Sequence, residues 1–261
     1  PDPRLAEAVD TISGMFHAGT FRSIVHIFND KRILTMSKST ATATWTGITA
    51  IDGSAGHVEF LMAEIRRELE PLGATVTFFD ESDLTDPDRE VDPMVAGMFQ
   101  LHNGWSNHVF MNGLYHTLGD GSDVDDPDDL DATRYGMLAC MPVLPVDGQA
   151  VTEAVALTEK VCGQYDLVPA IALNPLDANG METVINTYFD TTEPDQVDNA
   201  HACSKALHRA LYEDGFRFYR VDVAHMEFLT SQDASVWQAG ELLKSAFDPD
   251  DIIAPGRYNR R

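Results

Sequence analysis

The stretch TVINTYFDTTEPDQVDNAHACSKALHRALYEDGFRFYRVDV, residues 183–223, predicts a strand–helix–strand unit. An apolar and β-branched run opens it, an amphipathic stretch follows, and a second apolar and aromatic run closes it. We expect a strand at Thr183–Phe189, a helix at Pro194–Asp214 and a strand at Phe216–Val223.

A second unit of this kind precedes it. Strands are expected at 45–52 (WTGITAID) and 74–80 (ATVTFFD), on either side of a helix at 57–72. The apolar residues of that helix recur at helical spacing, which predicts one buried stripe. They are Val58, Leu61, Met62, Ile65, Leu69 and Leu72.

The third unit has an apolar strand at Tyr135–Leu144, an amphipathic helix at Gly148–Cys162 and a strand at Leu167–Leu173. Near the start of the chain, 22–36 (RSIVHIFNDKRILTM) predicts a strand with a bend or a hairpin at the turn-like dipeptide Asn29-Asp30.

Strand–helix–strand units with antiparallel joins indicate an α+β fold. We expect a large, mainly antiparallel sheet covered by helices 57–72, 149–162 and 195–214, built from paired ferredoxin-like halves. The predicted domain organisation is 1–225 for the sheet domain and 226–261 for a C-terminal helix and tail.

Charge and composition limit the classes of partner. The chain has 42 acidic and 18 basic residues and a net charge of −24, which disfavours nucleic acids and anionic membrane surfaces. Such a surface serves solubility or the docking of a cationic partner. The three cysteines lack metal-ligand spacing, and no apolar run is long enough to span a membrane. An odd number of cysteines makes a disulfide framework unlikely, so we expect a cytoplasmic protein. No signal peptide is visible, and the non-Met start suggests processing, trimming or an incomplete chain.

Common cofactor and catalytic motifs are missing: the sequence has no G-x-G-x-x-G, no Walker A lysine motif and no G-x-S-x-G elbow. Three aspartates invite a calcium hypothesis, but the EF-hand pattern does not fit, and a solvated loop is favoured. They are Asp123, Asp125 and Asp128. Three histidines lie within fifteen residues without i,i+4 spacing, so a pocket lining is favoured over a metal site. They are His102, His108 and His116.

Four strings, in this order, resemble one family. They are HAGTFRSIVHIFNDKRIL (17–34), PVLPVDG (142–148), INTYFDTTEPDQVDNAHACSKALHRALYEDGFRFYRVD (185–222) and LLKSAFDPDDIIAPGRY (242–258). The chain is similar to the C-terminal half of the vanillyl-alcohol oxidase and 4-cresol dehydrogenase family of flavoproteins. The resemblance covers 15–258 and is thinnest over 80–133.

The resemblance implies a cap domain that covers the isoalloxazine ring of FAD. The FAD-binding half is absent from this sequence, so we expect it in the same precursor or in a separate subunit. The chain alone is expected to bind FAD weakly. The family transfers a hydride from a 4-substituted phenol to flavin, which implies an oxidase or dehydrogenase in aromatic compound catabolism. A cationic electron carrier such as a cytochrome is a further implied partner.

The resemblance also implies site residues. Tyr219 and Arg220 match the pair that stabilises the phenolate, and Arg257 matches a position near flavin and substrate. Two positions depart from the family, because Glu182 and Asn186 stand where relatives often have a His and an Asp.

The cofactor linkage is left open by the sequence. Tyr135 is the nearest candidate for a covalent flavin tether, and noncovalent FAD is the alternative. The absence of the His and the Asp at these positions also leaves a second function open. In that reading the chain is a non-catalytic α+β binding or scaffolding module descended from such a cap.

Overall fold

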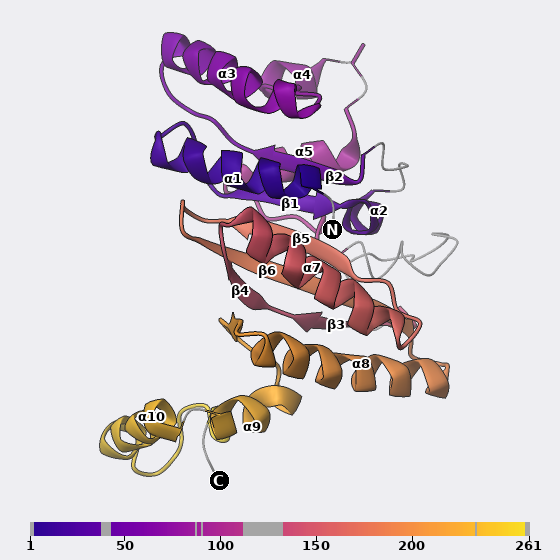
Figure 1. The fold of residues 1–261 in the computed structure, drawn as a ribbon, viewed down its shortest axis with the longest axis vertical. Coiled ribbons are helices and arrows are strands. Elements are labelled where there is room, and N and C mark those ends of the chain that lie inside the picture. The colour runs from indigo at the N-terminus through magenta and orange to yellow at the C-terminus, as the bar shows by residue number, and fades with distance from the viewer. Residues whose placement is uncertain are drawn as a thin grey trace. The chain divides into compact units, whose positions relative to one another are not determined.

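The computed structural model describes residues 3–37, 43–86, 88–89, 91–111, 133–232 and 234–258. The chain forms two compact units, Pro1–Arg217 and Phe218–Arg261 (Figure 1). The first unit contains the sheet. The second contains two helices and the C-terminal segment. The boundary falls eight residues before the predicted one, within the short strand β7 (Arg217–Phe218).

The sheet of the first unit is antiparallel at every pairing described. Its strands are β1 (Val25–Asn29), β2 (Trp45–Thr49), β3 (Tyr135–Cys140), β4 (Pro142–Pro145), β5 (Ala170–Pro175) and β6 (Gly180–Asp190). The order is β2-β1-β5-β6-β4, and β3 pairs with the other half of β6 on the same side as β4. The predicted α+β fold with a large antiparallel sheet is therefore confirmed.

One face of the sheet is covered by three long helices: α1 (Pro3–His17), α7 (Gly148–Gly163) and α8 (Pro194–Glu213). α7 packs between α1 and α8, and α8 contacts β3 and β6 (Figure 1). The strands present fully buried aliphatic side chains on this face, because alternate residues of a strand point to the same side. Ile171 and Leu173 are at most 1% exposed.

A close approach fixes how α1 meets α7. At Gly148, an added Cβ would lie 2.3 Å from the carbonyl oxygen of Ala6. The backbone N–H of Gly148 also donates to Asp10 Oδ1 at 2.7 Å, and Asp147 caps α7 by accepting from Ala150 N. Only glycine fits where two backbones come this close.

The opposite face carries a second apolar cluster. Phe28, Ala172 and Val184 lie on this face and pack against α2 (Asp30–Met36) and α5 (Pro93–His102). Met98 of α5 is fully buried in the cluster. The sheet is therefore covered on both faces, and the polar residues described below lie among these apolar contacts.

The remaining elements of the first unit form an outer layer. They are α3 (Ala55–Leu69), the 3-10 turn η1 (Glu70–Leu72) and α4 (Glu81–Thr85). α3 confirms the predicted amphipathic helix. It packs on α1, and only Leu61 and Ile65 of its stripe are buried.

Several predicted strands were wrong in detail. Residues 74–80 form no strand, and Phe78 and Phe79 instead lie under the guanidinium groups of Arg66 and Arg89. The turn-like Asn29 does not open a hairpin, because its side chain caps α2.

The other two differences concern strand length. The predicted strand Tyr135–Leu144 is interrupted at Met141, which divides it into β3 and β4. The predicted strand at Phe216–Val223 shrinks to β7, since Asp222 starts a helix there.

The second unit contains α9 (Val223–Gln232) and α10 (Ala234–Phe247). α10 confirms the predicted C-terminal helix. Asp248 stabilises the turn after α10, because its carboxylate accepts from the backbone N–H groups of Ile252 and Ile253, both at 2.9 Å. Of the helices within the described residues, none has the length and apolar character needed to cross a membrane.

Candidate functional site

The face of the sheet that packs on α2 and α5 carries a row of polar side chains across three strands. His26 Nδ1 and Asn174 Oδ1 are 2.9 Å apart, and Asn174 pairs in register with Glu182. Burial lowers the pKa of His26 more than the hydrogen bond from its Nδ1 to Asn174 Oδ1 raises it. Burial also lowers the pKa of His102, whose ring lies edge-on to His26 at 5.4 Å. Both rings are therefore neutral at pH 7.

Asn186 lies four residues beyond Glu182 on the same face. It is 3% exposed, and its Nδ2 donates to Tyr188 Oη at 3.4 Å. Its register partners on both sides are alanines, Ala170 on β5 and Ala139 on β3. Neither neighbour offers a donor, and Asn186 Oδ1 has no hydrogen-bond partner among the described residues.

The side chain of Arg32, on the first turn of α2, reaches the hydroxyl of Tyr188. Its Nη1 donates to Tyr188 Oη at 3.1 Å, and its guanidinium lies 5.6 Å from the centroid of the Phe110 ring. Arg32 is 5% exposed, and burial lowers the pKa of its guanidinium. No carboxylate pairs with it within the part of the chain that the structure describes.

The side chain of Asn29 fixes the backbone position of Arg32. Asn29 Oδ1 accepts from Arg32 N at 2.8 Å and from Ile171 N at 2.9 Å, while Asn29 Nδ2 donates to Pro169 O. One side chain thus ties the start of α2 to the start of β5. This network explains why the chain turns into a helix at Asp30.

Tyr135 lies at the far end of the same face. It pairs with Asp190, whose carboxylate forms an ion pair with Arg134 at 3.1 Å, and the Arg134 guanidinium lies 5.2 Å from the Tyr135 ring centroid. Strand residues advance about 3.4 Å each, so Glu182, Asn186 and Tyr135 follow one another at intervals of roughly 13 Å. The structure brings the three predicted residues to one face, though not into one cluster.

The other predicted residues lie in the second unit. The Arg220 guanidinium lies 5.4 Å from the centroid of the Tyr219 ring, and both side chains are exposed. β7 ends at Phe218, so the two side chains escape the alternation that would send them to opposite faces.

Arg257 belongs to the same unit. The next residue, Tyr258, accepts from Val221 N at 3.1 Å and donates to Val221 O at 3.3 Å, and its ring stacks on Trp237. The exposed Arg257 is thereby tied to the segment that carries Tyr219 and Arg220. Among the described residues, no carboxylate neutralises it.

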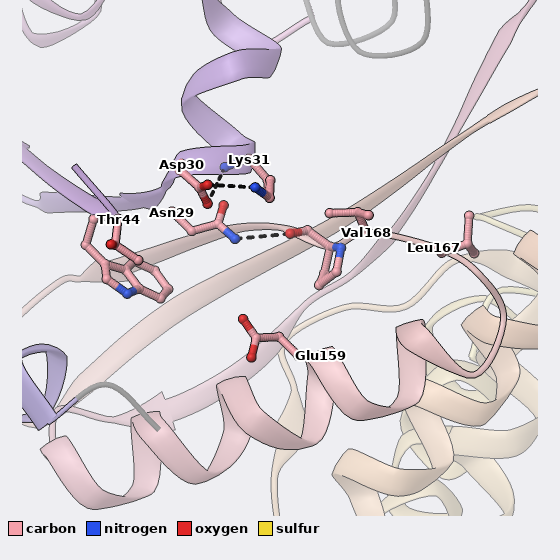
Figure 2. Close-up of a pocket in the computed structure, with 9 residues that line it drawn as sticks. Asn29, Asp30, Lys31, Thr44, Glu159, Leu167 and Val168 are labelled. Carbon is pink, nitrogen blue, oxygen red and sulfur yellow. Dashed lines mark hydrogen bonds and ion pairs between the residues drawn. The ribbon is translucent and has the colours of Figure 1, made fainter. Parts of the chain in front are cut away.

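A separate pocket of about 180 Å³ opens at the end of β1 (Figure 2). Glu159 projects from α7 toward it, and Lys31 and Asp30 pair at its rim at 2.7 Å. The side-chain amide of Asn29 is already hydrogen-bonded there to the backbone of Pro169 and Ile171. The pocket contains none of the predicted site residues. It is lined by Asn29, Asp30, Lys31, Thr44, Trp45, Glu159, Leu167, Val168 and Pro169.

The two metal hypotheses have different outcomes. Across the described ranges, no three His, Cys, Asp or Glu side chains converge to hold a metal ion. His102 lies against His26, while His116 and the aspartates of the calcium hypothesis lie outside the described residues.

Sequence reasoning missed Arg32, Tyr188, His26 and Asn174. Tyr188 could have been found, because it follows Asn186 by two residues in a strand and so shares its face. Arg32 carried a weaker signal, as the second of two adjacent cations before the apolar residues Ile33 and Leu34.

No protein-family profile matches the chain. Over 232 residues, 87% of the chain, it is 25% identical to the 4-cresol dehydrogenase [hydroxylating] flavoprotein subunit of Pseudomonas putida, of which it covers 40%. Over 133 residues, 51% of the chain, it is 28% identical to 1'-carboxy-chondrochloren decarboxylase of Chondromyces crocatus, of which it covers 25%.

Solved structures share the fold. p-Cresol methylhydroxylase with substrate bound matches 99% of this chain and 50% of its own, with a TM-score of 0.80 and 20% identity. 4-Ethylphenol oxidase from Gulosibacter chungangensis, in complex with isoeugenol, matches 99% and 52%, with a TM-score of 0.82 and 13% identity. The chain thus spans about half, or less than half, of the length of these relatives. Sequence and fold together confirm its resemblance to the cap-domain half of the vanillyl-alcohol oxidase and 4-cresol dehydrogenase flavoproteins.

Proposed function

We propose that this chain is the cap and substrate-binding part of an FAD-dependent oxidoreductase that oxidises a 4-alkylphenol or a related aromatic alcohol. The observation that carries the proposal is the similarity to the 4-cresol dehydrogenase flavoprotein subunit along 87% of the chain. The names of the two phenol-oxidising structural relatives support the same substrate class.

FAD is held mainly by another part of the enzyme in this proposal, either in the same precursor or in a separate subunit. The residues of this chain fit the flavin side of such a site. Arg257 is exposed without a neutralising carboxylate among the described residues, which suits a flavin that becomes anionic on reduction. Tyr135 is half-buried and is our candidate for a covalent tether, with noncovalent binding as the alternative.

Tyr219 and Arg220 bind the phenolate oxygen in the proposed mechanism. An ionised phenol loses strong hydration when it leaves water, and two charge-assisted donors replace that hydration. Bound FAD supplies the hydride acceptor. The side chains of this chain orient the ring and stabilise its negative charge.

Glu182 and Asn186, on β6 of the first unit, are two further site residues in this proposal. Glu182 is the half-buried carboxylate of the polar row and would accept the proton of an incoming water. Asn186 cannot act as a base, and its free Oδ1 accepts a hydrogen bond instead.

The proposal is tested on an assembled flavoprotein. The chain would be produced together with the FAD-binding half encoded at its locus, and flavin reduction by 4-ethylphenol would be followed without oxygen. Rapid bleaching of the flavin supports the proposal. A cationic electron carrier such as a cytochrome is the proposed partner for reoxidation, because the net charge of −24 favours its docking.

The second candidate is a non-catalytic module that binds small aromatic molecules. The amide at Asn186, where a carboxylate is expected, favours it. The same experiment separates the two candidates. A flavoprotein that binds 4-ethylphenol and never reduces its flavin supports the module and overturns the enzyme.

A further inference from the structure

The buried guanidinium of Arg32 is the feature that the proposed phenol chemistry does not use. A charged side chain that is 5% exposed normally has a carboxylate partner, because removing an ion from water is costly. Throughout the described residues, Arg32 has only neutral partners: the hydroxyl of Tyr188 and the ring of Phe110.

The hydrogen bonds around Tyr188 leave two donors without acceptors. Tyr188 Oη accepts from Arg32 Nη1 at 3.1 Å and from Asn186 Nδ2 at 3.4 Å. Both lone pairs of the hydroxyl are then occupied, so its own O–H is free to donate. Arg32 Nε–H is also buried without an acceptor among the described residues.

One positive charge and two uncommitted donors suit an anion with one charge and two oxygens. A carboxylate has this chemistry, and charge-assisted bonds from an N–H and an O–H are the strong kind. A phosphate needs more donors than the cluster offers. Asn29 fixes the backbone of Arg32, and the Tyr188 hydroxyl holds its guanidinium, before any anion arrives, which lowers the entropy cost of binding.

We propose that Arg32 and Tyr188, with Asn186 orienting the tyrosine hydroxyl, form a binding site for the carboxylate of a small molecule. The site goes beyond the proposed oxidation of phenols. All three residues lie in the first unit.

The experiment measures binding to the complete chain without flavin. Benzoate is the probe, acetate tests the carboxylate alone, and benzamide is the uncharged control of the same size. We expect benzoate to bind at least tenfold more tightly than benzamide. Acetate binding equal to benzoate assigns a free small carboxylate, and tighter benzoate binding assigns an aromatic acid. Equal binding of benzoate and benzamide, or no benzoate binding, overturns the proposal.

Variants locate the site. Arg32→Met keeps most of the side-chain volume and should lose benzoate binding at least tenfold, while Tyr188→Phe should lose it severalfold. Arg22→Met, at an exposed arginine of the same segment, is the matched control and should bind like the parent.

The melting temperature of each variant shows whether lost benzoate binding is due to misfolding. Without ligand, Arg32→Met should melt at or above the temperature of the parent, since it removes an uncompensated buried charge. A lower melting temperature together with no benzoate binding by the parent means that a carboxylate of the chain itself neutralises Arg32. That outcome overturns the site and leaves the proposed phenol oxidation untouched.

Discussion

The hydroxyl of Tyr258 bonds both backbone polar groups of Val221, 37 residues earlier in the chain, at 3.1 Å to its N–H and 3.3 Å to its C=O. This pairing ties the C-terminal segment that carries Arg257 to the segment that carries Tyr219 and Arg220. Three residues proposed to act on substrate and flavin thus belong to one unit, although Arg257 is distant in sequence from Tyr219 and Arg220.

Tyr258→Phe should loosen that unit. It removes both hydrogen bonds while keeping the ring that stacks on Trp237. Each bond contributes about 1 kcal/mol. We therefore expect faster hydrogen exchange at the Val221 amide, measured by NMR, with the sheet amides of the first unit unchanged. Unaltered exchange at Val221 would show that the tie contributes nothing.

Arg220→Ala should lower kcat/KM for a 4-alkylphenol in the assembled flavoprotein by about ten- to a hundredfold or more, because a charged hydrogen bond contributes roughly 1.5–3 kcal/mol. Tyr219→Phe should lower kcat/KM by a smaller factor. Arg220→Lys should not restore full activity, since an ammonium lacks the planar fork of the guanidinium. Arg209→Ala, on the exposed side of α8, is the control. Parental turnover by Arg220→Ala would exclude this phenolate site.

Gly148→Ala should destabilise the first unit by about 1–3 kcal/mol, as overpacking against a rigid backbone does. The new Cβ would lie 2.3 Å from Ala6 O. Gly163→Ala, at the other end of α7, meets nothing within 4 Å and should be neutral or stabilising. Urea unfolding of both variants measures the difference. Equal stabilities would mean that α1 is free to move away from α7.

His26 should make stability depend on pH. Because burial lowers its pKa in the folded state, the unfolded chain binds more protons below pH 6.5, and this residue's contribution to stability falls with the pH through that range. His26→Gln should therefore lose less stability than the parent between pH 7 and pH 5 in urea unfolding. His201→Gln, at an exposed position, should follow the parent. Identical pH slopes for all three proteins would contradict the assignment.

Hydrophobic periodicity predicted the long helices well and the edge strands poorly. α7 and α8 follow from local pattern because helical contacts join residues three and four apart. Residues 74–80 have a strand-like composition, but no neighbouring strand pairs with them, and Arg66 and Arg89 cover their phenylalanines instead. A strand exists only with a partner, and composition does not name the partner.

Of the residues implied by the family resemblance, some lie close together in the structure and others are spread along the sheet. The resemblance picked out Tyr219 and Arg220, and the structure brings them together because β7 ends just before them. Glu182, Asn186 and Tyr135 share one face of the sheet, yet extended backbone spreads them along it. The four-residue spacing of Glu182 and Asn186 in a strand puts them on a common face, but it does not bring them into a common cluster.

By itself, the sequence determined the α+β class, the succession of strands and helices in 135–213, the strong negative charge and the resemblance to a flavoprotein cap. Each of these depends on composition or on neighbours within a few residues. The tertiary structure alone decided that Arg32 meets Tyr188, 156 residues away, through a contact of 3.1 Å. That meeting requires β1 to pair with β5 and β5 with β6 in one register, and register is set by packing across the whole sheet.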